Sequence, residues 1–193
     1  MLTQLSSVKT RLAILETDLT YDTILTNAIV AVSRRFDLQC SRTLARTESL
    51  LQEFEADSTE ISLACYPLET VTRFELKSSE QDGWQEQTGV DYLLRHSCFV
   101  SLSEPLGSPR DQARLTYTGG YVLPGSVPAA GQTPLPDEIE QAAIEQLAFW
   151  FQNRNTVGVL ELWPAGGVFQ KFAGSDLLPS VMAVLGRYTR WQL

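Results

Sequence analysis

The chain has 193 residues, of which 44% are hydrophobic and 20% are charged, and its formal net charge is -8 at pH 7. These values exclude a disordered chain and are typical of a globular protein that forms one domain or two small ones. The acidic balance argues against a protein that holds nucleic acid by neutralising phosphates, because that mode requires clustered Lys and Arg. Any DNA is therefore expected to pass without being held tightly.

The cysteines and the start of the chain indicate the compartment. Cys40, Cys65 and Cys98 are widely spaced and contain no Cys-x-x-Cys pair, so they are predicted to be reduced thiols. The first residues lack the basic start and apolar run of a signal peptide, and no stretch is long enough to cross a bilayer. We therefore expect a protein of the cytoplasm, or of a particle assembled there.

Residues 1–48 predict an antiparallel pair of amphipathic helices. The first is expected from Thr3 to Ile14, with Lys9 and Arg11 on its exposed side. Its apolar face is predicted to contain Leu5, Val8, Leu12 and Leu15. The second is expected to begin near Thr20, whose hydroxyl can cap the free amides of the first turn. Its buried stripe is predicted to contain Leu25, Ile29, Val32 and Phe36.

Residues 49–121 change to the period-two pattern of half-buried strands. Three segments alternate in this way, and their inward residues are Ile61, Leu63 and Cys65, then Thr72, Phe74 and Leu76, then Ala113, Leu115 and Tyr117. Two further strands are expected over 90–95 and 99–102. Turn signals rich in Gly, Pro and Asp separate the segments. The sequence therefore predicts an inserted antiparallel β domain, either a small sandwich or a barrel.

Residues 122–193 are predicted to contain a connector loop and two C-terminal helices. Residues 122–134 are rich in Pro, Gly and Ala and fit neither periodicity. One helix is expected from Pro136 to Phe151, and the last begins around Pro179. The last helix is expected to bury Val181, Leu185 and Tyr188. With a long loop over 155–175, the fold class is predicted to be α+β: a bundle of N- and C-terminal helices with an inserted antiparallel β domain.

Residues that could carry catalysis are few. His96 is the single histidine, so a Cys/His hydrolase or a metal site would lack further partners. The acidic pair Asp137 and Glu138 fits the positive end of a helix dipole, and the acids over 53–57 fit the solvated face of a strand. Gly119-Gly120 and Gly166-Gly167 lack the context of a phosphate loop and are predicted to be turn glycines with positive φ. No catalytic, cofactor or metal residue is predicted.

Two groups of side chains are candidates for contact with partners. Arg34, Arg35, Arg42 and Arg46 gather at and just beyond the end of the second helix. Cations at a helix C-terminus are favoured by its dipole, which is a sufficient structural explanation. The functional alternative is a local basic patch that meets an acidic partner or passing DNA. The C-terminal Arg187, Arg190 and Trp191 form the second group, of residue types that dominate protein interfaces.

The segment 155–175 presents a similar choice. Trp163, Phe169 and Phe172 flank a glycine-rich tip. Folded back, they would form a satellite core under the loop, whereas extended they would form an arm that docks on a neighbour. The arm is favoured because a loop of this length in a compact domain is usually functional or disordered.

The signals follow one another in a definite order. They are a short helix ending near Leu15, a polar turn with Asp18, the helix through Ala28, Ile29 and Phe36, the strand insertion closed by Tyr117-Thr118-Gly119-Gly120-Tyr121, Leu135-Pro136-Asp137 opening a helix that ends Phe151-Gln152-Asn153-Arg154, and Leu178-Pro179-Ser180-Val181 leading to Arg187, Tyr188 and Arg190. Over nearly the whole chain this order resembles the head-tail connector proteins of long-tailed bacteriophages, also called adaptor or head-completion proteins.

The resemblance implies a non-enzymatic structural subunit of the virion, without cofactor or membrane partner. In that family, identical copies, usually twelve, form a ring beneath the portal, and the bore conducts the genome to the tail. By position, the portal or the adjacent subunit would be contacted by Val181, Leu185, Arg187, Tyr188, Arg190 and Trp191. The loop 155–175 would reach a neighbouring subunit or the next ring. The β insertion is larger than in all-helical members and would decorate the ring or contact tail components.

Three other functions are compatible with the sequence. A tail-completion or tail-terminator subunit would bind the tail tube instead of the portal. A small hydrolase would place a site between sheet and bundle, and replacement of His96 would then abolish activity. A generic adaptor module of a bacterial complex would differ mainly in its partner.

Overall fold

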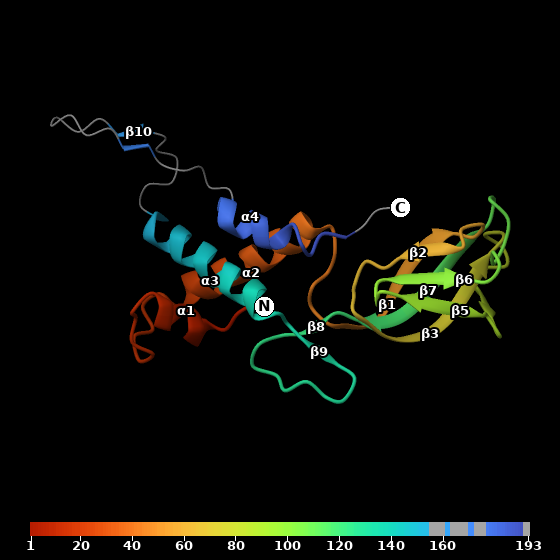
Figure 1. The fold of residues 1–193 in the computed structure, drawn as a ribbon, viewed down its shortest axis with the longest axis horizontal. Helices are drawn as coiled ribbons and strands as arrows, with labels where there is room; N and C mark the ends of the chain where they lie inside the picture. Colours follow the sequence, from red (N-terminus) through yellow and green to blue (C-terminus); the bar gives the residue numbers. More distant parts are fainter. Residues whose placement is uncertain (155–160, 163–169, 172–176, 191–193) are drawn as a thin grey trace. The chain divides into compact units, whose positions relative to one another are not determined.

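The computed structural model describes residues 1–154, 161–162, 170–171 and 177–190 (Figure 1). The chain divides into two compact units. The helical unit contains the described residues of Met1–Phe36 and Pro136–Tyr188, and the sheet unit contains those of Asp37–Leu135 and Thr189–Leu193. The fold is therefore α+β, with a sheet domain inserted between N- and C-terminal helices, as the sequence predicts.

The N-terminal part of the helical unit contains α1 (Leu5–Arg11) and most of α2 (Asp22–Cys40). The predicted stripe of α2 is confirmed, because Leu25, Ile29, Val32 and Phe36 are each at most 1% exposed. The first helix is shorter than expected and Leu15 is 74% exposed, so its assignment to the apolar face is wrong. The chain leaves the helix where Ala13 takes a φ of 54°, a left-handed conformation that cannot continue an α-helix.

Lys9 also differs from the prediction, since it is buried and not exposed. Its ammonium nitrogen lies 2.7 Å from an oxygen of Asp22 and donates to the carbonyl of Glu16 at 3.0 Å. A buried ammonium is tolerated only when it is paired and hydrogen bonded. The pair joins α1 to the first turn of α2 and replaces the solvated side chain that periodicity alone predicts.

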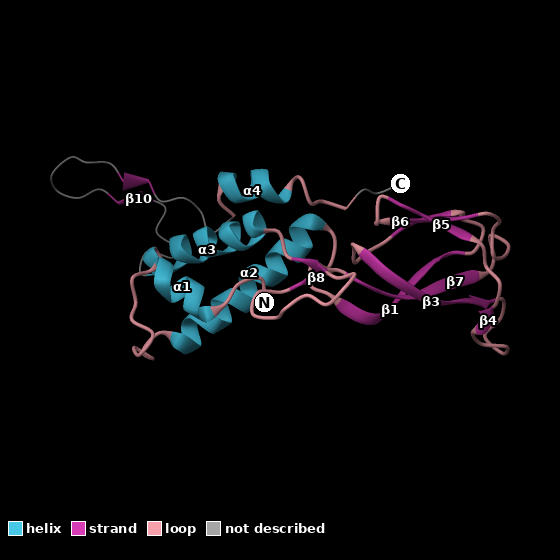
Figure 2. Ribbon diagram, turned by 60° about the horizontal axis from the view of Figure 1, so that its bottom comes forward, coloured by secondary structure: helices cyan, strands magenta, loops and turns pink. Residues whose placement is uncertain are grey.

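The C-terminal part of the helical unit contains α3 (Asp137–Gln152) and α4 (Pro179–Leu185) (Figure 2). Helix α3 packs against both α1 and α4 and buries Ile139, Ala143 and Leu147. The side-chain oxygen of Gln146, which is fully buried, accepts a hydrogen bond from the amide of Leu178 at 2.8 Å. This bond satisfies a free amide at the start of α4 and fixes that helix on α3.

The sheet unit contains two antiparallel sheets. The larger has the order β1-β7-β3-β4, with strands β1 (Thr47–Glu55), β3 (Leu68–Lys77), β4 (Gln85–Gln87) and β7 (Gln112–Gly119). The smaller has the order β2-β6-β5, with strands β2 (Glu60–Ser62), β5 (Tyr92–Arg95) and β6 (Phe99–Leu102). Both sheets contribute to one core, which includes Leu63, Phe74, Val100, Leu115 and Tyr117. Among the described residues no closed barrel forms, so the sandwich alternative fits.

The chain also contains two short strand pairs outside these two sheets. The segment predicted to be an irregular connector contains β9 (Thr133–Pro134), which pairs in parallel with β8 (Tyr121–Val122). Gly120 has the expected positive φ, 103°, whereas Gly119 does not; a Cβ on Gly119 would lie 2.8 Å from the carbonyl oxygen of Cys65. Strands β10 (Glu161–Leu162) and β11 (Gln170–Lys171) pair antiparallel. Within the described residues, no helix is both long and apolar enough to span a membrane.

Candidate assembly surfaces

The groups that could carry catalysis are not brought together in the described part of the chain. His96 lies exposed in the turn between β5 and β6, where it and Ser97 have φ values of 50° and 57°. The described residues contain no cluster of three or more His, Cys, Asp or Glu able to hold a metal ion. The position of His96 is that of a hairpin turn residue, because such turns require positive φ.

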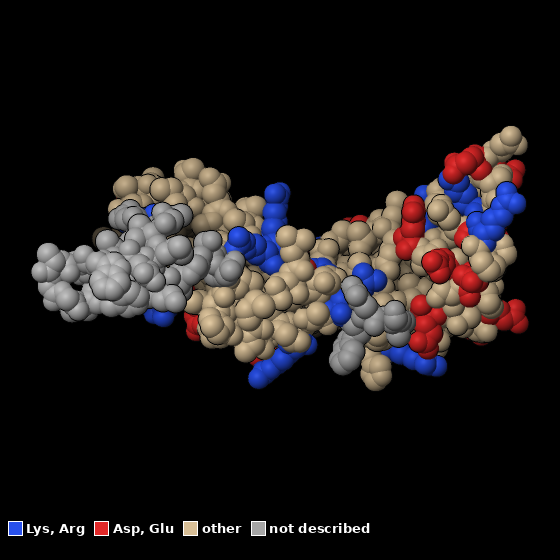
Figure 3. Space-filling view, turned by 90° about the horizontal axis from the view of Figure 1, so that it is seen from above, with Lys and Arg blue, Asp and Glu red and all other residues tan. Residues whose placement is uncertain are grey.

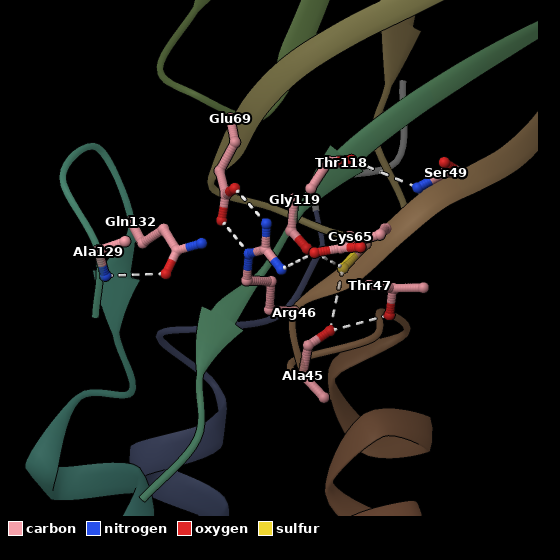
Figure 4. Close-up of polar contacts among 11 residues, drawn as sticks. Ala45, Arg46, Thr47, Ser49, Cys65, Glu69, Thr118, Gly119, Ala129 and Gln132 are labelled. Carbon is pink, nitrogen blue, oxygen red and sulfur yellow. Dashed lines mark hydrogen bonds and ion pairs between the residues drawn. The ribbon is translucent and has the colours of Figure 1, made fainter. Parts of the chain in front are cut away.

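The three cysteines are free thiols. Cys40 and Cys65 are buried and Cys98 is half-buried. Burial raises the pKa of the Cys40 thiol to about 11, because a thiolate is poorly solvated there, and it raises the pKa of Cys65 as well. The Cys65 sulfur lies between the carbonyl oxygens of Ala45 and Gly119, at 3.4 and 3.2 Å (Figure 4). These are structural thiols with little thiolate at neutral pH.

The predicted C-terminal contact residues fall into two sets. Val181 and Leu185 have 0% exposure and belong to the helical unit's own core. They stabilise the packing of α4 and offer no surface to a partner. Arg187 is exposed, with a guanidinium nitrogen 3.3 Å from Glu138, and the Tyr188 hydroxyl donates to the same carboxylate. An interface at this end of the chain therefore depends on exposed residues that follow α4.

The chain beyond Tyr188 joins the sheet unit. The amide of Arg190 donates to the carbonyl of Cys40 at 2.8 Å, and its guanidinium donates to Ser62, at 3.2 Å from the side-chain oxygen. Arg190 thus has a role in the fold of this unit. Trp191, like Trp163, Phe169 and Phe172 of the predicted arm, lies outside the described residues.

The four arginines of the predicted basic patch have different environments. Arg34 is exposed, and the guanidinium of Arg35 lies 5.3 Å from the ring centre of Trp150. Arg46 is paired with Glu69 through two hydrogen bonds, at 2.7 and 3.0 Å (Figure 4). It is also paired with Glu48 at 2.6 Å. Because both carboxylates neutralise it, Arg46 adds little positive charge to the surface.

Arg42 is buried, with 4% exposure, and is therefore not part of an open patch. Its guanidinium stacks on the ring of Tyr66, 3.1 Å from the ring centre, and donates to the Tyr66 carbonyl. Burial raises the pKa of the nearby Asp37. Two effects oppose that rise: the Leu44 amide donates a hydrogen bond to the Asp37 carboxylate at 2.9 Å, and the positive charge of Arg42 lies close to it. Arg42 and Asp37 thus anchor the end of α2 to the chain that follows. Sequence periodicity did not reveal the burial of Arg42, because Tyr66 lies 24 residues away in the sequence.

Most of the ion pairs among the described residues lie in the sheet unit. On the sheet unit, Arg114 lies 2.7 Å from Glu75, Arg95 lies 3.1 Å from Glu60, and Lys77 lies 2.6 Å from Glu80. Figure 3 shows carboxylates and cations interspersed over the face of this unit that it presents. In the helical unit, Arg34 of α2 and the carboxylates Asp137 and Glu145 of α3 are in no ion pair among the described residues. Arg110 and Glu104 of the sheet unit are likewise in no ion pair within the described part of the chain.

Comparisons with known proteins give the fold but no family. No family model matches the chain, and no curated protein matches it. Solved structures do match over nearly its full length. One is a chain in the neck of the empty gene transfer agent (GTA) particle computed with C6 symmetry. It superimposes on this chain with a TM-score of 0.62 at 13% sequence identity, and the match covers 97% of this chain and 89% of that one.

Two further structures agree. The virion of the native gene transfer agent (GTA) particle gives a TM-score of 0.57 at 14% identity, covering 97% of this chain and 89% of the other. The neck of the native GTA particle computed with C12 symmetry gives 0.52 at 15% identity, covering 98% and 89%. At such identity these likenesses show the fold alone.

Proposed function

We propose that this chain is a structural subunit of the neck of a phage-like particle, where copies form a head-tail connector ring that joins the capsid portal to the tail. The observation that carries the proposal is the match to GTA neck and virion chains over 97–98% of this chain. Independently, the order of helices, strands and turns in the sequence resembles that of phage head-tail connector proteins. A ring of twelve copies is compatible with both the C6 and the C12 symmetry of those necks.

The physical properties of the chain support this role. A ring closes when one surface of each copy fits a different surface of the next, and many weak contacts then act together. The net charge of -8 suits a channel component, because an acidic wall repels phosphates and lets DNA move without sticking. We therefore propose that DNA passes through the ring without sequence-specific binding.

The proposed contact with the portal uses the exposed end of the chain. Arg187 has 73% side-chain exposure, and the predicted interface continues through Tyr188 to Trp191. Truncation after Leu185 would also remove the Arg190 contacts to Cys40 and Ser62, so point variants test docking better than a deletion. The arm over 155–175, with Trp163, Phe169 and Phe172, is proposed to contact a neighbouring copy or the next ring.

The experiment is a binding assay with purified portal and tail proteins from the same particle. The chain should co-sediment with the portal, and Arg187→Ala should weaken this binding by about tenfold, as expected for an interface arginine. Arg110→Ala on the sheet unit is the matched control and should bind like the wild type. Exclusive binding to the tail would overturn portal docking in favour of a tail-completion subunit. A hydrolase activity lost on His96→Ala would overturn the structural role.

A further inference from the structure

The outer face of α2 carries an aligned set of exposed side chains. Ile24, Asn27, Ala31 and Arg34 follow at intervals of three and four residues, which places them along one side of the helix. Ile24 is 55% exposed, and the adjacent Val30 is 36% exposed. We call these five residues the α2 stripe. The opposite side of α2 already forms the core of the helical unit, so the fold itself does not require apolar residues in the α2 stripe.

The outer surface of α3 and α1 is acidic and so complements the positive charge of Arg34. Helix α3 contains acidic residues at Asp137, Glu138, Glu140 and Glu145 and no basic residue. Glu138 is engaged by Arg187 and Glu140 accepts a hydrogen bond from Thr3, while Asp137 and Glu145 are exposed. Beside them a hollow of about 530 Å³ opens between the two helices. Its lining is mostly polar and includes Arg11, Glu16 and Glu140 besides Thr10, Gln141 and Ile144. We call this the α1-α3 surface.

We infer that the α2 stripe of one copy packs against the α1-α3 surface of the next copy in the ring. This inference rests on the proposed ring, and it names the two surfaces through which neighbouring copies in that ring contact each other. The two surfaces share no residue, which is the requirement for a head-to-tail contact that repeats around a closed ring. Their net charges are opposite, since Arg34 would face a surface on which the carboxylates of Asp137, Glu140 and Glu145 outnumber the one cation, Arg11. The side chains of the stripe would lie against the walls of the hollow.

A second copy fits the α2 stripe better than DNA does. DNA contact would require several cations, whereas the stripe has one unpaired arginine among apolar and neutral residues. The complementary acidic surface belongs to the same polypeptide, so every copy brings both halves of the contact. Cross-linking therefore tests the inference directly.

The experiment uses full-length protein in a Cys98→Ser background, because Cys98 is the half-buried native thiol. One variant carries Ala31→Cys, and a second, with a larger tag, carries Gln141→Cys. The two are mixed at high concentration with a short bis-maleimide. A covalent heterodimer should form several-fold more than with a partner carrying Ser103→Cys, an exposed position on the sheet unit. Equal yields for the two partners would overturn the inference.

Charge exchange provides a second readout. Arg34→Glu and Glu145→Arg should each reduce the Ala31-Gln141 cross-link by about tenfold or more, since like charges would then face each other. Combining both substitutions in every chain should restore it. The matched controls Arg110→Glu and Glu104→Arg, both at exposed positions of the sheet unit, should leave it unchanged. Failure of the double variant to recover would contradict the pairing of these two surfaces.

The outcome is separable from that of the proposed function. Native mass spectrometry of the wild-type chain, alone and with the portal, reports whether a ring forms at all. A ring without the Ala31-Gln141 cross-link would place the subunit contact elsewhere while the neck role stands. Absence of any ring under both conditions would count against the neck role itself.

Discussion

The helical unit and the sheet unit differ in how much ion pairing and how much apolar packing they contain. Most of the ion pairs among the described residues lie in the sheet unit, as with Arg114 and Glu75 or Arg46 and Glu69, whereas the helical unit contains Lys9 with Asp22 and Arg187 with Glu138. The helical unit is held mainly by apolar packing between α1, α3 and α4 and by the buried stripe of α2. Exposed charges such as Arg34 and Glu145 are therefore not required by its fold. We therefore expect two kinds of substitution: those that lower the free energy of unfolding of the chain, and those that weaken the contact between subunits without unfolding it.

The largest loss of stability is expected from the apolar core. Phe36→Ala removes a side chain with 0% exposure from α2 and leaves a cavity. The free energy of unfolding should fall by about 3–5 kcal/mol, as measured by urea denaturation followed by helical circular dichroism. Leu38→Ala, at a position of α2 that is 79% exposed, is the control and should be nearly neutral. Equal effects at both positions would contradict the assigned buried face.

The next effect concerns the paired charges of the sheet unit. Glu75→Gln removes a buried carboxylate that accepts two hydrogen bonds from Arg114, at 2.7 and 2.9 Å. At pH 7 the free energy of unfolding should fall by about 2–3 kcal/mol, because the guanidinium loses a charged acceptor. Glu80→Gln is the control, since Glu80 is 89% exposed and its pair with Lys77 lies in solvent.

The same variant has a defined pH dependence. The hydrogen bond from Arg114 lowers the pKa of Glu75 below its ordinary value of 4.5 in the folded protein. The ionised carboxylate therefore stabilises the fold above pH 4.5, and this contribution disappears as the pH falls through the folded pKa. The stability difference between wild type and Glu75→Gln should shrink in that acidic range. A difference that grows with acidity would show that the pair is not as described.

A smaller effect is expected from a polar network in the sheet core. The Tyr117 hydroxyl donates to the side-chain oxygen of Gln52 and accepts from the amide of Cys65, both at 3.0 Å. Tyr117→Phe leaves that amide without its acceptor and should cost about 1–2 kcal/mol, as measured by urea denaturation. Tyr92→Phe, at a position that is 40% exposed, should change stability little. A neutral Tyr117→Phe would mean that another group satisfies the Cys65 amide.

The smallest effect on stability should accompany a large effect on assembly. Arg34→Glu changes an exposed residue of the α2 stripe and should alter the free energy of unfolding by less than about 0.5 kcal/mol. Its reduction of subunit cross-linking is the contrast that distinguishes an interface from a core position. Thermal unfolding of the monomer measures the first quantity. A marked destabilisation would show that Arg34 serves the fold and would remove the contrast between the two units.

Much of the fold could be predicted from the sequence, because amphipathic periodicity reports burial directly. The stripe from Leu25 to Phe36 and the alternation around Leu115 are examples, since each depends only on residues close in sequence. Lys9 and Arg42 could not be placed in this way. Their burial depends on Asp22 and Tyr66, which the fold brings near them.

The candidate site was predicted less well than the fold. Val181 and Leu185 were predicted to lie both in the core and at an interface, and the structure places them in the core. The residues from Ile24 to Arg34 that follow at intervals of three and four are visible in the sequence. They were not predicted to form a surface, because the buried stripe of the same helix is the stronger apolar pattern. Only the structure shows which of two faces of α2 the chain covers by itself.

The most direct test of the neck assignment is a cryo-electron microscopy reconstruction of the particle that contains this chain. Density for the helical and sheet units should repeat around a ring between the portal and the tail, with α2 of each copy against α1 and α3 of its neighbour. A particle whose neck lacks this fold, or in which the chain occupies the capsid shell or the tail tip, would contradict it.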